Sequence, residues 1–475
     1  MKPNILRSSR AGRWLTLGTV ALALPHLTAQ DWPQWRGPQR DGHAPGFQAP
    51  AAWPKTLTQQ WKVTVGEGVA TPALVGERLY VFSREEGREV LRCLEAATGK
   101  ELWQNSYESL GATGPAQSFS GPRSSPAVAA GKVVTVGVRG VISCLDATTG
   151  QVLWRKDDFK AWPNFFVSSS PLIVGDLCLA QLGGRDNGAL VAYDLASGVE
   201  KWRCPGAPAY ASPVLMTVGG EPLVVVQTES KLQAVALKDG QVAWESGPAE
   251  PGAGPGPGPG GPPGRGGRGG GRDYRATTPA VVGDTLLVLG QSAQAWKFEK
   301  TATGLRATEL WTNREKASVF ASPVVHEGLI FGLSAANEVF CLDRQNGQLL
   351  WSTPLGAAGE GPGGPPPGAP AAERPSRAEG APGPGGPPGP GGPGGPGGGR
   401  MRGGGGGFGS LVDAGSVLLS LTPAAELVVF APDRQAFKEL ARIKVADSPT
   451  HAHPVVSGKR IYVKDRDAVT LWRVE

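Results

Sequence analysis

Leu145–Trp154 reads Leu-Asp-Ala-Thr-Thr-Gly-Gln-Val-Leu-Trp, and variants of this stretch recur along the chain. In five copies a glycine stands four residues before a tryptophan, at 99/103, 150/154, 198/202, 240/244 and 347/351. An apolar segment followed by a polar turn, in which glycine accepts positive φ, predicts a β-hairpin. A single hairpin cannot bury its apolar face, so the repetition predicts similar units packed against one another. The predicted structural anchors are Trp61, Gly99, Trp103, Gly150, Trp154, Gly198, Trp202, Gly240, Trp244, Trp311, Gly347 and Trp351.

A second unit alternates with the first and consists of a small residue before proline, an apolar strand, a glycine turn and another strand. Its eight copies begin at Thr71, Ser125, Ser170, Ser212, Thr278, Ser322, Ser410 (without the proline) and His453. Together the two units give four strands per repeat. The last repeat has only three strands, and the strand around Trp61 has no partner of its own. We therefore predict an all-β, eight-bladed β-propeller in which the N-terminal strand, 57–65, completes the last blade and closes the ring.

The domain organisation follows from composition. Residues 1–29 have a basic start, an apolar run and a small-residue end, which is typical of a signal peptide cleaved near Ala29. Residues 30–56 are predicted to be an extended lead-in that packs its tryptophans on the body, and 57–475 to form the propeller. The Gly/Pro-rich insertions 248–272 and 356–409 interrupt the propeller, and their composition predicts disorder. Both insertions follow the last strand of a repeat, so both are expected on the same face.

Charge and cysteine usage narrow the class of protein. Four of the 47 basic residues fall within 1–29, which has no acidic residue, so 43 remain against 41 acidic residues. This balance does not favour nucleic acid as a partner. We expect a periplasmic or secreted protein, with no transmembrane segment after removal of the signal and no cysteine near the cleavage site for lipidation. Cys93, Cys144 and Cys341 occupy equivalent strand positions, which predicts buried apolar side chains rather than disulfides.

The combination of Ser/Thr-Pro-φ-Val, a glycine turn and Leu-Asp-x-x-Thr-Gly-x-x-x-Trp resembles the pyrroloquinoline-quinone (PQQ) type propeller repeat. The resemblance covers 57–475 apart from the insertions. The chain is similar to secreted PQQ-binding-like propellers, a group related to the outer-membrane protein assembly factor BamB, an eight-bladed binding scaffold without enzymatic activity. The missing lipidation cysteine departs from that assembly role.

The quinoprotein alcohol and glucose dehydrogenases of the same superfamily hold PQQ and Ca²⁺ in the central funnel. This resemblance implies the alternative function, a PQQ/Ca-dependent dehydrogenase acting on an alcohol or sugar. No adjacent cysteine pair occurs, and no acidic cluster recurs near the blade mouths as a Ca²⁺ site requires. We therefore expect no catalytic residues, no metal and no cofactor.

The candidate binding surface is the ring of residues just before each innermost strand. These side chains are expected at one central mouth, where arginines pair with anionic groups and aromatic rings offer stacking faces. The candidate residues are Arg123, Tyr210, Arg275, Phe320, His451 and His453. The preferred function is a non-catalytic, monomeric scaffold that binds a protein or another envelope component at this mouth. A polysaccharide-binding module is the second alternative.

Overall fold

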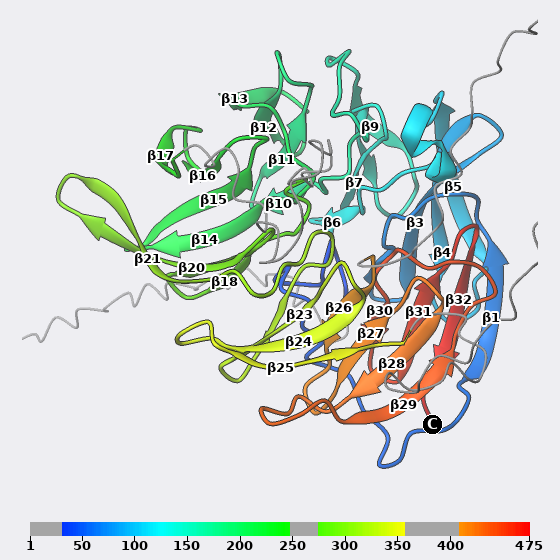
Figure 1. The fold of residues 1–475 in the computed structure, drawn as a ribbon. Coiled ribbons are helices and arrows are strands. Elements are labelled where there is room, and N and C mark those ends of the chain that lie inside the picture. The colour runs from blue at the N-terminus through cyan, green and yellow to red at the C-terminus, as the bar shows by residue number, and fades with distance from the viewer. Residues whose placement is uncertain (1–30, 248–273, 357–407) are drawn as a thin grey trace, which may run out of the picture.

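The computed structural model describes residues 31–247, 274–356 and 408–475, and these form eight four-stranded sheets arranged around an axis (Figure 1). This confirms the predicted eight-bladed all-β propeller. The predicted signal peptide, 1–29, and nearly all of the two predicted insertions, 248–272 and 356–409, lie outside the described residues. One short 3-10 helix, η1 (Gly114–Phe119), is the single helical element in the described ranges, and it is far too short to cross a bilayer.

Each blade is an antiparallel meander that runs from an innermost strand outward. Blade 1 comprises β2 (Ala73–Val75), β3 (Arg78–Glu85), β4 (Arg88–Glu95) and β5 (Glu101–Glu108); blade 2 comprises β6 (Ala127–Ala129), β7 (Lys132–Val136), β8 (Ile142–Asp146) and β9 (Val152–Lys156). Blade 3 comprises β10 (Leu172–Val174), β11 (Leu177–Leu182), β12 (Ala189–Asp194) and β13 (Glu200–Pro205); blade 4 comprises β14 (Val214–Val218), β15 (Glu221–Gln227), β16 (Leu232–Ala236) and β17 (Val242–Glu245).

The second half of the ring repeats this arrangement. Blade 5 comprises β18 (Ala280–Val282), β19 (Thr285–Leu289), β20 (Ala293–Thr301) and β21 (Gly304–Asn313); blade 6 comprises β22 (Val324–His326), β23 (Leu329–Leu333), β24 (Glu338–Asp343) and β25 (Leu349–Pro354). Blade 7 comprises β26 (Ser410–Asp413), β27 (Leu418–Leu421), β28 (Glu426–Phe430) and β29 (Glu439–Lys444); blade 8 comprises β30 (Val455–Ser457), β31 (Arg460–Lys464), β32 (Ala468–Arg473) and β1 (Thr58–Thr64).

The ring closes in blade 8, as predicted. The N-terminal strand β1 pairs antiparallel with the C-terminal strand β32, and Trp61 lies opposite Leu471. Trp61 is buried in the same hydrophobic cluster as residues of blades 1, 7 and 8. Both ends of the propeller chain are therefore paired in one sheet, which removes the open ends that a linear stack of sheets would leave.

Neighbouring blades are joined by the glycine and tryptophan of the repeat. Gly150 has φ +74°, and a Cβ added to it would lie 2.5 Å from Trp103 of the preceding blade. In the next junction the Trp154 indole N–H donates to the Leu195 carbonyl at 3.0 Å, just before the Gly198 turn. A side chain at these glycines would displace the indole ring, so the glycine serves both the turn and the inter-blade contact. The same contact joins Gly99 to Trp61, Gly198 to Trp154, Gly240 to Trp202 and Gly347 to Trp311.

The residue before each proline forms a second set of inter-blade contacts, closer to the axis. The Ser125 backbone N–H donates to the Ser170 hydroxyl at 2.9 Å, and the Ser170 N–H donates to the Ser212 hydroxyl at 2.9 Å. The His453 N–H donates to the Thr71 hydroxyl at 2.9 Å across the closing junction. Because a short hydroxyl side chain satisfies a buried backbone donor of the neighbouring blade, the recurring Ser or Thr has a structural role.

All five cysteines are free and buried, in agreement with the prediction for Cys93, Cys144 and Cys341. Cys204, which is also buried, lies in β13. Burial raises the pKa of the Cys144 and Cys341 thiols to about 12, so neither is ionised at neutral pH.

Candidate functional site

Seven rings cover the mouth of the central channel, one from each of seven consecutive connections between blades. We call this set the aromatic arc: Phe119, Phe165, Tyr210, Tyr274, Phe320, Phe408 and His451. Phe320 and Phe408 stack at 4.2 Å between ring centroids, and Phe119 meets His451 edge to face at 4.6 Å. These two contacts belong to one series that leads from Phe165 through the other rings to Phe119. The connection from blade 8 to blade 1, 65–72, contributes no aromatic residue.

Three of the predicted mouth residues, Tyr210, Phe320 and His451, lie together in the aromatic arc. All are partly buried, whereas Phe408 is 42% exposed. The Tyr210 hydroxyl accepts a hydrogen bond from the Phe165 backbone N–H at 3.1 Å, which fixes the tilt of its ring. Burial lowers the pKa of His451 to about 4, so this imidazole is neutral at physiological pH and acts as one more ring of the arc.

Arg123 lies at the edge of the arc, but its guanidinium is turned inward. One terminal nitrogen, Nη2, donates to the carbonyls of Ala116 and Phe119, at 3.1 and 2.9 Å. Burial lowers its pKa to about 10, which leaves it charged at neutral pH. Arg123 therefore holds η1 and the Phe119 ring in place. Arg275 lies in the connection from blade 4 to blade 5, three connections further along the chain, with φ +46°, and its carbonyl accepts a hydrogen bond from the Ala211 N–H.

His453 does not lie at the mouth, and the prediction for this residue was wrong. Its side chain is buried inside the channel, where it meets Trp35 edge to face at 4.5 Å between ring centroids. Burial and the nearby Arg36 charge hold its pKa well below the ordinary value. The chain bends at Ala452, between the two histidines, so the His451 ring meets Phe119 and Phe408 while the His453 ring meets Trp35.

Sequence reasoning missed Phe119, Phe165, Tyr274 and Phe408. Tyr210, Phe320 and His451 each stand three residues before the proline, whereas Tyr274 stands five and Phe165 six residues before it. The connections differ in length, so residues at different offsets reach the same place. Counting aromatic residues over whole connections, rather than at a fixed offset, would have found them.

Behind the arc, the channel is filled by the lead-in, whose blue trace runs inside the ring of blades in Figure 1. Trp32 is fully buried and bridges Leu74 of β2, and the Trp35 indole N–H donates to the Thr278 hydroxyl of blade 5 at 2.9 Å. Arg36 donates to the Pro323 carbonyl of blade 6, and Arg40 to the Pro171 carbonyl of blade 3. One short segment thus ties blades on opposite sides of the axis together.

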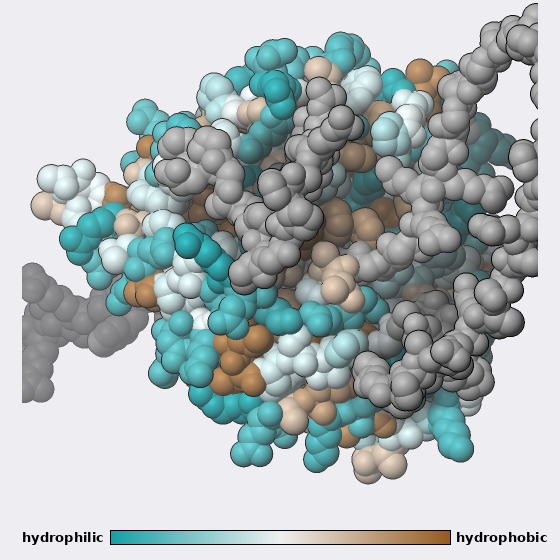
Figure 2. All heavy atoms as spheres, viewed as in Figure 1, coloured by the Kyte–Doolittle hydropathy of each residue, from teal (hydrophilic) through white to brown (hydrophobic). Residues whose placement is uncertain are grey.

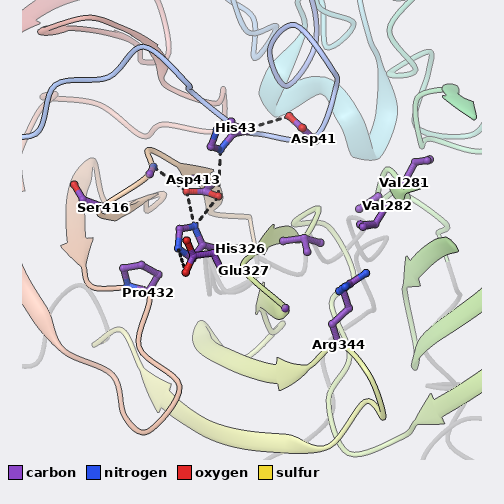
Figure 3. A pocket seen from close by; sticks show the side chains of 14 residues that line it. Asp41, His43, Val281, Val282, His326, Glu327, Arg344, Asp413, Ser416 and Pro432 are labelled. Atoms are coloured by element: carbon purple, nitrogen blue, oxygen red, sulfur yellow. Dashed lines mark hydrogen bonds and ion pairs between the residues drawn. The ribbon is translucent and has the colours of Figure 1, made fainter. Parts of the chain in front are cut away.

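A pocket of about 730 Å³ opens at the other end of the channel, between the lead-in and blades 5 to 7 (Figure 3). Asp413 lies between two imidazoles: its carboxylate is 3.2 Å from His43 Nδ1 and 3.1 Å from His326 Nδ1. Val281, Val282 and Arg344 line the opposite side of the pocket.

The electrostatics of this pocket favour the protonated, positively charged form of His43 and the ionised form of Asp413. The hydrogen bond to Asp413 raises the pKa of His43 despite partial burial. Burial of Asp413 opposes its ionisation, but hydrogen bonds from His43, the Gly415 N–H and His326 outweigh burial and lower its pKa. The carboxylate therefore links the lead-in to blades 6 and 7. Among the described residues, no three His, Cys, Asp or Glu side chains are placed to hold a metal ion.

Comparison with known proteins shows which family the chain resembles. A family model described as "Outer membrane protein assembly factor BamB" matches residues 51–205 and 87–353. BamB of Shewanella oneidensis is 23% identical over 314 residues, which cover 62% of this chain and 69% of the relative.

Two solved structures share the fold. The crystal structure of BamB from Moraxella catarrhalis has a TM-score of 0.54 at 14% identity and covers 88% of this chain and 98% of its own. The quinohemoprotein alcohol dehydrogenase of Comamonas testosteroni has a TM-score of 0.57 at 13% identity, with coverages of 94% and 80%. The family match spans more than half of the sequence, and the chain therefore belongs to the PQQ-repeat β-propeller family of the outer membrane protein assembly factor BamB.

Proposed function

We propose that this protein is a non-catalytic scaffold of the bacterial envelope that binds a protein partner on the aromatic arc at the mouth of its channel. The observation that carries the proposal is the arc itself. Seven partly exposed rings from seven separate connections converge on one surface, although the strands of the core do not need them there. Contiguous exposed apolar surface marks interaction sites, and aromatic residues are enriched where partners bind.

The placement of hydrophobic side chains supports a partner at the centre of the disc. Figure 2 shows hydrophobic residues near the middle of the face in view, with hydrophilic residues prominent around its rim. An apolar centre surrounded by a polar rim is the usual anatomy of a protein interface. The relatives named as assembly factors support a protein as the partner, and the signal-like N-terminus supports a periplasmic or secreted location.

The residues around the axis do not fit PQQ with Ca²⁺, the group that the quinoprotein relatives imply. The lead-in side chains Trp35, Arg36 and Arg40 occupy the axis, where the quinoproteins hold their cofactor. Asp413, the carboxylate of blade 7 that contacts the lead-in at His43, is already bound by two histidines. We therefore derive no oxidation step for this chain. Dye-linked oxidation of alcohols or sugars after addition of PQQ and Ca²⁺ would contradict this conclusion.

A photo-cross-linking experiment tests the proposed docking surface. A photoreactive phenylalanine analogue at Phe320 or Phe408 is expected to cross-link one and the same envelope protein in the source cells. The matched control is Leu310, which is 49% exposed on β21, the outermost strand of blade 5, and does not stand in a connection between blades. Equal cross-linking from Leu310, or none from either arc position, would overturn the proposal.

Truncation of the rings then measures their contribution. With the cross-linked partner purified, Tyr210→Ala combined with Phe320→Ala is expected to raise Kd about 30-fold, because central aromatic residues carry most of the binding energy of an interface. Leu310→Ala should leave Kd unchanged. Binding of the arc to soluble glycans in place of a protein would favour the polysaccharide-binding alternative.

A further inference from the structure

Two arginines of the lead-in are buried on the axis of the propeller. Arg36 is 1% exposed, and its Nε donates to the Arg40 carbonyl at 3.2 Å while Nη2 donates to the carbonyls of Asp41 and Pro323. Arg40 is 3% exposed, and its terminal nitrogens donate to the carbonyls of Ser170 and Pro171 and to the Gln34 amide oxygen. Every acceptor that these two guanidinium groups use is therefore uncharged.

Four buried nitrogens of the lead-in and its surroundings have no hydrogen-bond partner: Trp32 Nε1, Arg36 Nη1, Arg40 Nε and His453 Nδ1. Burial lowers the pKa of both Arg40 and His453, and the Arg36 charge lowers it further, so Arg36 lies within electrostatic reach of each of them. Since buried donors are nearly always satisfied, the two unpaired guanidinium nitrogens point to a group that these arginines bind, and the neutral His453 ring adds a third donor in the tautomer that carries its proton on Nδ1.

The charge of the region specifies the sign of that group. Neither Arg36 nor Arg40 forms an ion pair with a carboxylate of the described ranges, although the buried Arg92 of blade 1 pairs with both Glu85 and Glu101. Burial lowers the pKa of Arg36 more than the charge of Asp41 raises it, so Asp41 does not offset the burial of this guanidinium. Two like charges in a region that excludes water repel each other and lose their hydration. A negative ion beside them offsets both costs, whereas a neutral molecule offsets neither.

We propose that the central channel binds a small inorganic anion, such as chloride, phosphate or sulfate, between Arg36, Arg40 and His453. The lead-in supplies both cationic ligands and also closes the channel from the pocket side. The anion therefore stabilises the lead-in inside the channel, because it compensates the charges of its two buried arginines. It is distinct from the partner surface, because the ligands lie on the axis behind the aromatic arc.

Crystals of the full-length protein soaked in sodium bromide test the site directly. We expect an anomalous difference peak within hydrogen-bond distance of Arg36 Nη1 and Arg40 Nε. A refined water at that position with no anomalous signal would overturn the proposal. This measurement uses the wild-type protein and does not depend on whether any variant folds.

Thermal unfolding at constant ionic strength distinguishes the anions. Relative to sodium gluconate, whose anion is large, the anion that fits is expected to raise Tm by about 3 °C at a concentration about 100 times its Kd. Chloride, phosphate and sulfate are measured separately. The same Tm in all four salts would show that no anion binds the folded state preferentially.

Two sets of substitutions distinguish anion binding at this site from a general effect of removing a buried arginine. Arg36→Gln combined with Arg40→Gln is expected to abolish the dependence of Tm on the anion. Arg92→Gln removes an arginine that is also buried but is paired with carboxylates, so it should lower Tm and retain the anion dependence. An identical loss of anion dependence in Arg92→Gln would contradict the assignment to Arg36 and Arg40.

Discussion

The two ends of the central channel are built in different ways. At the mouth, seven separate connections each contribute one ring, and the outermost, Phe408, is 42% exposed. At the opposite end a single segment, the lead-in, enters the channel, and its Trp32 is completely buried. Aromatic residues thus occur at both ends but in different surroundings. The comparison indicates that rings at the mouth are available to a partner, whereas those of the lead-in stabilise the ring of blades.

The largest expected difference between the two ends is in the cost of removing one aromatic side chain. Trp32→Ala leaves a cavity at a position with 0% exposure, and we expect it to lower the free energy of unfolding by about 3–5 kcal/mol. Phe408→Ala removes a ring that is 42% exposed, and we expect a loss of unfolding free energy below about 1 kcal/mol. Urea unfolding followed by tryptophan fluorescence and circular dichroism measures both values.

Partner binding should show the reverse order. Phe408→Ala is expected to weaken the binding of the partner. Trp32→Ala should bind the partner with normal affinity at temperatures below its unfolding transition, where the variant is folded. Equal losses of stability in the two variants would remove the distinction between the ends of the channel.

A second, smaller effect concerns the acidic residue at the pocket end. Asp413→Asn removes the negative charge that binds His43 and His326. We expect the free energy of unfolding to fall by about 2 kcal/mol, which is typical of buried hydrogen bonds to a charged group. Glu327→Gln is the matched control, since Glu327 lines the same pocket but is exposed. The control should change stability by less than about 0.5 kcal/mol.

The loss of stability in Asp413→Asn should depend on pH in a definite direction. The pKa of His43 is raised in the folded protein above its ordinary value of 6.5, so its stabilisation is present below pH 6.5 and is lost as the pH rises through the raised pKa. The pKa of Asp413 is lowered below 3.8, so its stabilisation is present above that pH and is lost in stronger acid. The difference between wild type and Asp413→Asn should therefore be larger at pH 5 than at pH 8. A constant difference would show that the His43 charge plays no part.

The sequence predicts the fold well because each blade is specified by a local sequence pattern that repeats along the chain. The glycine turns, the apolar strands and the tryptophans recur with each blade, and the unpaired strand at Trp61 required a partner at the other chain end. The role of the glycines was only half predicted. Positive φ at Gly150 follows from the turn, but its contact with Trp103 of the preceding blade requires the packed structure.

The sites were predicted less completely because they depend on contacts between segments that are far apart in the sequence. Tyr210, Phe320 and His451 share a fixed distance from a proline, and this regularity revealed them. The pair of His43 and Asp413 joins residues that share no pattern, so nothing in the sequence links them. The lead-in was expected to pack on the body, but its insertion along the axis follows from the width of an eight-bladed channel, which a repeat pattern does not specify.

The smallest effect separates the ring of Tyr210 from its hydroxyl. Tyr210→Phe leaves the Phe165 N–H without its acceptor, and we expect a loss of about 1 kcal/mol in unfolding free energy. The control is Tyr274→Phe, because Tyr274 contributes ring contacts with Phe165, Tyr210 and Phe320 to the arc, and this change retains them. It should cost less than about 0.5 kcal/mol. Both variants keep every ring of the mouth, so partner affinity should stay within about 3-fold of wild type, in contrast to alanine substitutions. A large loss of affinity in Tyr210→Phe with normal stability would show that the partner is recognised through the hydroxyl group, and the mouth would then be a polar site rather than an aromatic one.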